Sequence, residues 1–498
     1  MDQNLLKKEW FVLEKLYSYA PYALEPPVWA MTHQMSEFGC GDVLYSFHEY
    51  NNGYTKMCFL SEEWDNAAEK TLKKISEDPS VLDKIHQESE DKVKAIKEWY
   101  EKITNLNLQN YSDEELTKTY KILMPLQRRL HFLRCPVWQM ETRREIFSNY
   151  LLDLLKNIIE EKKLDLDPIL VFSSLVTPTK MTLANYEHLD LLKLAGKIQS
   201  GELEFSPDLI EIENHIKKYQ YLTFGAEGPA WGRDYVLAHL QDLLNKYKEI
   251  DKEIDKYENQ FEFVRLEQQE IFKKIPLNKN QIHLFEVAKE AMYQRGWSKE
   301  HQFMVFYLIY LILKEIARRL NISTKQAMYM LSHEIISALK LKEIDNDNLN
   351  DRFKFGLMII EGKDSYFLTG KKAKEFMFAV NLKEENKINL ENITEIKGQT
   401  AVKGNVRGKV KIINNVAEMN KMEAGDILVS EMTIPEIVPA MKKAAAIIAD
   451  RGGITCHAAI VSRELGIPCI ISTKIATQVF KDGDMVEVNT DNGIVKKL

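Results

Sequence analysis

One stretch near the end of the chain combines residue types that suit phosphate chemistry. It reads GGITCHAAIVSRELGIP and runs from Gly452 to Pro468. The double glycine permits a tight turn that other residues resist, and a helix is predicted from His457 to Gly466. Unpaired backbone N–H groups in the first turn of a helix favour an anion and disfavour protonation of a histidine ring there. A neutral imidazole nitrogen can attack phosphorus, so the stretch predicts a histidine that accepts a phosphoryl group.

Four neighbours of His457 are predicted to hold the phosphate. Thr455 offers a hydroxyl to a phosphate oxygen, and Arg463 offers a cationic fork. Gly453 and Cys456 are the other two predicted phosphate-binding positions, because they lie in the same turn.

Two small residues follow the histidine. Ala458 and Ala459 are expected to leave the surface low, so that another protein surface can approach closely.

Each residue of the histidine stretch, taken singly, also has a plainer interpretation. A lone histidine near a helix start is usually a cap or a packed surface residue, Thr455 an ordinary capping residue, and Arg463 a solvated helix cation. The run as a whole favours phosphate chemistry.

A small α/β domain is predicted to position this histidine, within residues 398–498. The last 103 residues hold 9 glycines, as a chain of alternating strands, helices and turns requires. The predicted elements are a β-hairpin-like pattern over 400–413, a strand at 426–430, a helix opened by Pro435, a strand at 445–449, the helix from His457, and short strands near 469–472 and 485–489.

The histidine stretch resembles the swivelling phosphohistidine domain of phosphoenolpyruvate synthase, pyruvate phosphate dikinase, rifampin phosphotransferase and the sugar phosphotransferase Enzyme I. The pattern of that family is G-G-x-T-S-H-A-A-I-x-A-R-E-x-G-I-P. This chain has Cys456 where serine is usual and Ser462 where alanine is usual. Neither change touches the nucleophile, although Cys456 could alter local phosphate contacts.

The resemblance extends from about Gly398 to Leu498. The segment 425–429, followed by Thr433 and Pro435, is similar to the family's G-D-[IV]-L-V…T-x-P segment. Residues 482–495 are similar to its closing D-G-D-x-V-x-V…G-x-V strands. The resemblance implies a mobile domain whose histidine carries the phosphoryl group.

The region 1–380 is predicted to be mainly α-helical, almost throughout. Residues 1–395 hold only 12 glycines, as long helices would. Apolar residues from Leu243 to Val264 recur at spacings of four and three, which predicts one long helix, either in a bundle core or as a protruding coiled-coil arm. Residues 302–320 predict a buried helix, and residues 381–397 a linker. The predicted fold class is therefore multidomain, with a large helical region followed by the small α/β phosphohistidine domain.

The bulk composition excludes several classes of protein. A net charge of −7 argues against nucleic-acid binding through a basic surface. Five cysteines without a C-x-x-C pair indicate a reducing compartment. The longest apolar run, 304–313, is about half of the twenty residues that a membrane span needs. With no signal-like N-terminus, these features predict a soluble, cytoplasmic protein.

The resemblance also implies partners. Enzymes of this family couple the histidine domain to an ATP-grasp domain and to an acceptor site. Residues 1–395 show neither a glycine-rich phosphate loop nor the strand content of an ATP-grasp fold, and no pyruvate-binding barrel is expected after residue 498. The domain order is most similar to rifampin phosphotransferase without its ATP-grasp half. We therefore expect a phosphotransfer subunit of a split dikinase, with the ATP β-phosphate and Mg²⁺ arriving on a separate ATP-grasp partner. No motif predicts a directly bound cofactor or metal.

The helical region is expected to bind a small-molecule acceptor. Residues 219–231 are loosely similar to a Y-G-x-R…P-R-W segment of the rifampin phosphotransferases, and residues 327–334 to their D-[IV]-F-Y-L…E element. In that subfamily the helical middle region holds the acceptor.

Candidate acceptor-binding residues come from two places. Trp231 and Arg233 follow Gly228 in a predicted loop, where binding residues concentrate. Arg128 and Arg129 lie on a helical stretch that suits an anionic substrate or the travelling phosphate, together with Arg134, Arg143, Arg144, His131 and Trp138. The alternative for this stretch is a solvated, salt-bridged helix face. His33 is a further candidate, with a packed histidine as its alternative.

A second class of function stays open on the sequence alone. The chain can also be a regulatory phosphocarrier that takes phosphate from phosphoenolpyruvate or another phosphoprotein. An acceptor enzyme should have a concave pocket in the helical region, whereas a phosphocarrier should show a flat, apolar docking face.

Overall fold

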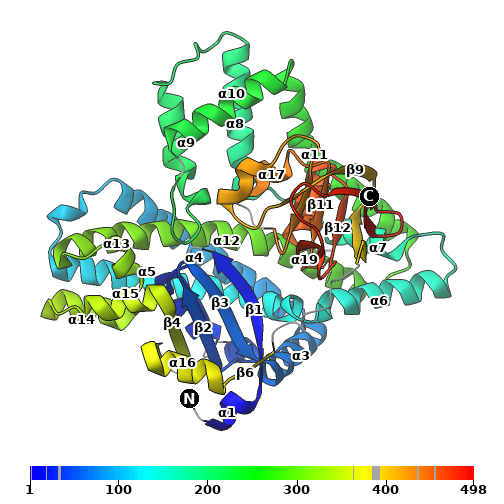
Figure 1. Cartoon of the computed structure of the whole chain (residues 1–498). Coiled ribbons are helices and arrows are strands. Elements are labelled where there is room, and N and C mark those ends of the chain that lie inside the picture. The colour runs from blue at the N-terminus through cyan, green and yellow to red at the C-terminus, as the bar shows by residue number, and fades with distance from the viewer. Residues whose placement is uncertain are drawn as a thin grey trace. The chain divides into compact units, whose positions relative to one another are not determined.

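The computed structural model describes residues 1–498 apart from 2, 18, 32–34, 231, 363, 384–392, 434–436 and 454–455. The chain divides into two compact units (Figure 1). The first unit comprises residues 1–143, 178–270 and 278–384, and the second comprises 144–177, 271–277 and 385–498. In the described ranges, no helix is long and apolar enough to cross a membrane.

The predicted fold class is confirmed: a large helical region precedes a C-terminal domain that contains strands. The predicted boundaries 1–380, 381–397 and 398–498 remain a prediction, because part of the linker lies outside the described residues.

Helix α12 (Lys279–Leu320) forms the centre of the first unit and packs on α4 (Ser80–Thr104) and α5 (Asp113–Thr142). Asn278 starts α12 with a capping box, because its side chain accepts the backbone N–H of Gln281 at 2.9 Å. The helix buries most of its faces from Phe303 onwards and ends at Leu320. The buried helix predicted at 302–320 is thus the last part of a longer one.

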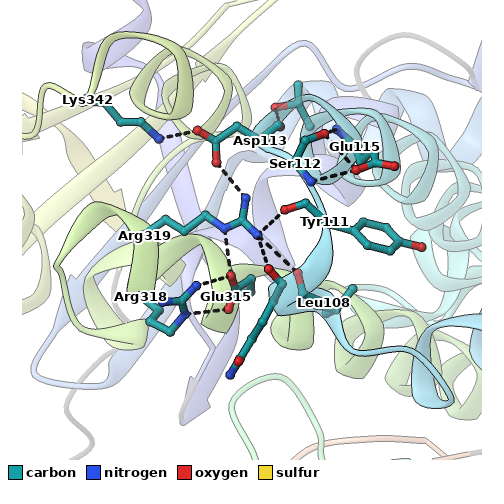
Figure 2. A network of polar contacts seen from close by, with 11 residues as sticks. Leu108, Tyr111, Ser112, Asp113, Glu115, Glu315, Arg318, Arg319 and Lys342 are labelled. Carbon is teal, nitrogen blue, oxygen red and sulfur yellow. Dashed lines mark hydrogen bonds and ion pairs between the residues drawn. The ribbon is translucent and has the colours of Figure 1, made fainter.

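A network of ion pairs fixes the end of α12 (Figure 2). Arg319 donates to Glu315 at 2.8 Å and to Asp113 at 2.9 Å, and it also donates to backbone carbonyls of the segment before α5. Lys342 reaches the second oxygen of Asp113 at 2.6 Å. The network joins the N-terminus of α5, the C-terminus of α12 and the residue after α14 (Ser332–Leu341).

The first unit is mainly helical as predicted, but it also contains a sheet that was not predicted, antiparallel except for the parallel pair β1 and β6. Its strand order is β5-β4-β2-β3-β1-β6. The strands are β1 (Glu9–Tyr17), β2 (Tyr45–Asn51), β3 (Tyr54–Leu60), β4 (Gly356–Glu361), β5 (Asp364–Thr369) and β6 (Asn381–Lys383). The sheet therefore joins the beginning of the unit to residues about 300 positions later.

Both faces of this sheet are covered. In β4, Met358 and Ile360 pack into the large helical core, whereas Leu357 and Ile359 pack into a second core with Phe376 of α16 (Gly370–Ala379). Strands that are buried on both faces read as short apolar runs rather than as an alternation, and such runs are ambiguous between strand and helix.

A separate core joins α8 (Leu183–Gln199), α9 (Ile210–Tyr219), α10 (Arg233–Lys246) and the start of α11 (Ile250–Lys274) (Figure 1). The single long helix predicted from Leu243 to Val264 is wrong, because the chain leaves the helix between Lys246 and Ile250. Ile250 then turns inward and is fully buried.

Shorter helices complete the first unit. They are α1 (Gln3–Lys7), α2 (Pro21–Met31), η1 (Met35–Phe38), α3 (Ser61–Glu77), η2 (Leu108–Asn110), η3 (Gln220–Thr223), α13 (Thr324–Met328) and α15 (Asn346–Phe355).

The second unit contains a sheet of order β7-β14-β13-β9-β10-β11-β12-β8. Its strands are β7 (Glu395–Lys397), β8 (Gln399–Val402), β9 (Asn405–Ile412), β10 (Ile427–Ser430), β11 (Ala446–Ala449), β12 (Cys469–Ile471), β13 (Met485–Asn489) and β14 (Ile494–Lys497). Strands β9 to β12 run parallel, and the outer strands are antiparallel.

The strands predicted at 426–430, 445–449, 469–472 and 485–489 are confirmed, whereas the hairpin at 400–413 is wrong. Strand β8 pairs with β12 and strand β9 pairs with β10 and β13, so the two lie far apart in the sheet order. The helix predicted to open at Pro435 begins outside the described residues; α17 (Val438–Met441) follows. The other helices of this unit are α6 (Ile146–Glu161), α7 (Pro168–Val176), η4 (Val416–Lys421), α18 (His457–Leu465) and α19 (Ala476–Val479).

Candidate phosphohistidine site

His457 is the first residue of α18, as predicted, and the helix ends at Gly466 in the left-handed conformation with φ 66°. The turn before it depends on glycine. Gly452 has φ 104°, and a Cβ atom there would lie 2.5 Å from Cβ of Cys456, closer than side chains approach. The backbone N–H of Cys456 donates to the carbonyl of Gly453 at 2.9 Å, which closes the turn onto the helix.

The ring of His457 is held from the neighbouring strand. Its Nδ1 atom lies 2.8 Å from Oγ1 of Thr433. Thr433 is buried, and it follows β10 just as the histidine turn follows β11. Strands β10 and β11 are parallel, so both loops leave the same edge of the sheet. The histidine itself is half-buried, which keeps its ring at the surface of the unit.

A buried carboxylate anchors the loop that carries the histidine. Asp450 is 3% exposed and follows β11 directly. It accepts hydrogen bonds from Oγ1 of Thr473 at 2.8 Å, from the backbone N–H of Thr477 at 3.0 Å and from the N–H of Ala476. Ser472 donates to the carbonyl of Gly452 at 2.7 Å. These bonds fix the start of the turn to the loop after β12.

The first turn of α18 presents backbone N–H groups beside His457. Among the described residues, the side chain of the N-cap residue Cys456 makes no capping hydrogen bond. The positive end of the helix dipole lies at this end of α18 and favours an anion there.

The structure brings together only part of the predicted phosphate-binding set. Gly453 and Cys456 lie in the turn, and Thr455 lies outside the described residues. A Cβ atom at Gly453 would lie 2.6 Å from the carboxylate of Glu145, so a side chain here would require the Glu145 side chain to move. Arg463 is in the last turn of α18, about 9 Å from His457 along the helix axis at about 1.5 Å per residue. Its role in phosphate binding stays a prediction.

The expectation that Ala458 and Ala459 lower an open surface is wrong. They are 1% and 0% exposed, and α18 packs with this side on β8, β11 and β12. Ser462, which replaces the usual alanine, is also fully buried. Small residues are needed here because the helix lies close to the sheet.

Two of the predicted acceptor-binding arginines are engaged in ion pairs. Arg129 donates to Glu88 and to Glu37, each at 2.8 Å, and Arg233 donates to Asp208 at 2.6 Å and to Glu213. Both sets of ion pairs favour a salt-bridged surface over a substrate site at these arginines.

The other candidates are placed as follows. Arg128 is half-buried on α5. Arg143 pairs with Asp65, His131 accepts from or donates to Gln302 at 2.6 Å, and Trp138 is in the helical core. His33, Trp231 and the side chain of Arg134 lie outside the described part of the chain.

Sequence reasoning missed the role of Thr433. The residue belongs to the T-x-P segment that resembles the family, so the signal was present. Thr433 lies 24 residues before His457 in the sequence, so a contact between them could be predicted only from the parallel pairing of β10 and β11.

Comparison with known proteins supports the same site. Residues 422–493 match the model of the PEP-utilising enzyme, mobile domain. A probable phosphoenolpyruvate synthase of Archaeoglobus fulgidus is 53% identical over 125 residues, which cover 25% of this chain and 16% of the relative. The phosphoenolpyruvate synthase of Pyrococcus furiosus is 53% identical over 102 residues, covering 20% and 12%. That of Escherichia coli is 52% identical over 86 residues, covering 17% and 11%.

The chain thus spans about a sixth or less of the length of these curated relatives. Its C-terminal region carries a PEP-utilising mobile domain that is homologous to phosphoenolpyruvate synthases, which implies phosphotransfer through a phosphohistidine. Among solved structures, the holo-form of aconitase X from Thermococcus kodakaraensis is similar, with 20% identity, a TM-score of 0.18, and coverage of 21% of this chain and 98% of that chain.

Proposed function

We propose that this chain is the phosphotransfer subunit of a split, ATP-dependent dikinase-type enzyme, in which Nε2 of His457 carries the phosphoryl group. The observation that carries the proposal is the 2.8 Å contact between Nδ1 of His457 and Oγ1 of Thr433 at the start of α18. A neutral imidazole has one donor and one acceptor nitrogen, and the hydroxyl of Thr433 can donate or accept; in this proposal it accepts the Nδ1–H.

The chemistry follows from this tautomer. When Nδ1–H donates to Thr433, the lone pair lies on Nε2, which attacks the phosphorus of the donor. The N–P bond forms while the bond from phosphorus to the donor's leaving oxygen breaks. The ring then carries positive charge, and Thr433 continues to accept its Nδ1–H. In the second step an acceptor hydroxyl attacks phosphorus, the N–P bond breaks, and the hydroxyl proton is released.

The donor in this proposal is ATP, bound with Mg²⁺ on a separate ATP-grasp protein. Attack of Nε2 on the β-phosphorus breaks its bond to the α-phosphate oxygen and releases AMP. Water then displaces the γ-phosphate as inorganic phosphate, which leaves the β-phosphoryl group on the ring. The acceptor is a small molecule held by the first unit. The resemblance of the C-terminal domain to the PEP-utilising enzymes supports the histidine step, and the helical first unit resembles the acceptor region of rifampin phosphotransferases only loosely.

Label transfer tests the proposal. The protein is incubated with β-labelled or γ-labelled ATP, with and without an ATP-grasp protein from the same genome. We expect acid-labile label from the β position only when the partner is present. His457→Ala should abolish the label, whereas His283→Ala, a change at an exposed helix position, should retain it.

Three results would contradict the proposal. Label that persists in His457→Ala would place the phosphate on another residue. Label that appears from phosphoenolpyruvate but never from ATP would favour the regulatory phosphocarrier, and ATP consumption by this chain alone at an enzyme-like rate would rule out the split.

A further inference from the structure

A group of buried polar side chains lies in the first unit, away from His457 in the sequence. We call it the tyrosine–glutamate cluster: Glu25 of α2, Tyr50 of β2, Gln127 of α5, Glu227 after η3, and Tyr329 after α13. Tyr50 and Gln127 are 0% exposed, Tyr329 is 1% exposed, and Glu25 is 3% exposed. The side chain of Glu227 is 9% exposed. Five separate segments of chain thus bring polar groups to one interior.

Contacts connect these residues to one another. The rings of Tyr50 and Tyr329 are 5.6 Å apart in an edge-to-face arrangement. Lys325 pairs with Oε2 of Glu227, and its ammonium group lies 5.6 Å over the ring of Tyr329. Gln127 donates to the carbonyl of Tyr22 at 3.3 Å.

Tyr22 links Gln127 to the segment of Glu227, because its hydroxyl donates to the carbonyl of Ala226, the residue before Glu227. Burial raises the pKa of Tyr50, and the negative charges of Glu25 and Glu227 raise it further. Both carboxylates therefore act on the same phenol group.

Four polar atoms in this cluster lack a hydrogen-bond partner among the residues that the structure describes. They are the hydroxyl oxygens of Tyr50 and Tyr329, Oε1 of Gln127 and Oε1 of Glu227. Buried polar atoms in folded proteins almost always have a partner, so each exception needs an explanation. Four exceptions in one interior point to a group that supplies the missing donors and acceptors.

The atoms themselves define the chemistry of that group. The oxygens of Gln127 and Glu227 only accept, so they need hydrogen donors, whereas each phenol hydrogen needs an acceptor. A hydroxyl group both donates and accepts, and it satisfies both needs. Lys325 pairs with Glu227, Arg352 pairs with Glu334, and Glu25 accepts hydrogen bonds from Ser332 and Ser365, so a further anion would lie beside carboxylates whose partners are already engaged. The rings of Tyr50 and Tyr329, with Phe367 5.9 Å from Tyr50, suit an apolar or ring-shaped body.

We propose that the tyrosine–glutamate cluster is the binding site for an uncharged, hydroxyl-bearing small molecule with a ring-shaped body. Its hydroxyls contact Tyr50, Tyr329 and Glu227. We identify this molecule with the acceptor of the phosphoryl group. That identification rests on the proposed function, whereas the inference of the binding site does not.

Binding and stability are measured on the full chain with catechol, phenol and cyclohexanol as probes. Anisole, which lacks a hydroxyl, and benzoate, which is an anion, are the matched comparisons. We expect catechol to raise the melting temperature and to bind in calorimetric titration, and anisole and benzoate to do neither. Tyr50→Phe and Tyr329→Phe should each weaken catechol binding about tenfold, because each removes a hydrogen bond to the ligand.

The same variants test whether the hydroxyls lack partners in the free protein. Tyr50→Phe and Tyr329→Phe should leave the melting temperature of the free protein unchanged or raise it, because no bond is lost. The control is Tyr219→Phe: this tyrosine is 1% exposed, and its hydroxyl donates to Asp190 at 2.8 Å. Tyr219→Phe should lower the melting temperature and leave catechol binding intact.

Three results would overturn the site. If none of the hydroxylated probes binds, water is the partner of these atoms. Anisole or benzoate binding as tightly as catechol, or unchanged catechol binding in both Tyr→Phe variants, would also contradict the site. Failure of the proposed function gives a different pattern. In that case catechol binds as described, but no label passes to it from phosphorylated protein.

Discussion

One buried polar group in each unit can be compared, and the two differ in how their hydrogen bonds are satisfied. In the second unit, Asp450 lies beneath the histidine turn, and both of its carboxylate oxygens accept hydrogen bonds from Thr473, Ala476 and Thr477. In the first unit, Tyr50 and Tyr329 bury hydroxyls that no described residue binds. A satisfied network rigidifies a scaffold, whereas unsatisfied atoms remain available to a ligand. The second unit therefore holds one reactive ring in place, and the first retains capacity for binding.

The largest expected effect is the loss of the Asp450 anchor. Asp450→Ala leaves the backbone N–H groups of Ala476 and Thr477 without the carboxylate that accepts from them. We expect the free energy of unfolding of the second unit to fall by about 3 kcal/mol or more. Urea denaturation measures it, with Asp491→Ala as the control because Asp491 makes an exposed contact with Asn405. An equal free energy of unfolding in the two variants would contradict the anchoring role of Asp450.

The next effect concerns the turn before the histidine. Gly452→Ala adds both left-handed backbone strain and a collision with Cys456, and we expect it to cost about 3 kcal/mol. Gly425→Ala has a comparable backbone strain, with φ 92°, but nothing within 4 Å of the new Cβ, so about 1 kcal/mol is expected. The difference between the two unfolding free energies isolates the collision. If the two costs are the same, the turn adjusts and the close approach is unimportant.

A smaller effect is expected from the contact on the ring. Thr433→Val keeps the shape of the side chain but cannot accept the Nδ1–H of His457. Loss of one hydrogen bond, about 1.4 kcal/mol, corresponds to a tenfold slower phosphorylation. Thr433→Ser should remain within about threefold of the original rate. Quench-flow measurement of label on the histidine gives both rates, and a wild-type rate in Thr433→Val would remove threonine from the mechanism.

The smallest effect lies in the ion-pair network at the end of α12 (Figure 2). Hydrogen bonds from Arg318 and Arg319 lower the pKa of Glu315, although burial acts in the opposite direction. Glu315 therefore contributes stability that is fully present above its unfolded pKa, about 4.3, and is lost as the pH falls through the lower folded pKa.

Arg319→Ala should lower the free energy of unfolding by about 1 kcal/mol at pH 7 and by less at pH 3, because Glu315 loses its negative charge as the pH falls. Denaturation at the two pH values measures the change. A loss that is equal at both values would show that packing, not charge, gives Arg319 its effect.

Sequence reasoning was strongest where the signal is local. The turn, the helix from His457 and the strands β10 to β13 depend on glycines, caps and apolar runs within a few residues of one another. The sheet of the first unit was missed because one of its pairings joins β2 to β4, about 300 residues apart, and because β4 contains a four-residue apolar run without alternation. Arg129 and Arg233 were chosen by residue type alone, and only the structure shows the carboxylates beside them. Thr433 needed the parallel pairing of two strands.

The most direct test of the central claim is to locate the phosphorus on the ring. The phosphorylated protein, with its histidines labelled with ¹⁵N, is studied by ³¹P–¹⁵N correlation spectroscopy. The proposed tautomer predicts one acid-labile phosphorus coupled to Nε2 of His457, with a proton retained on Nδ1 next to Thr433. Coupling to Nδ1, or a phosphorus signal that persists in His457→Ala, would contradict the account.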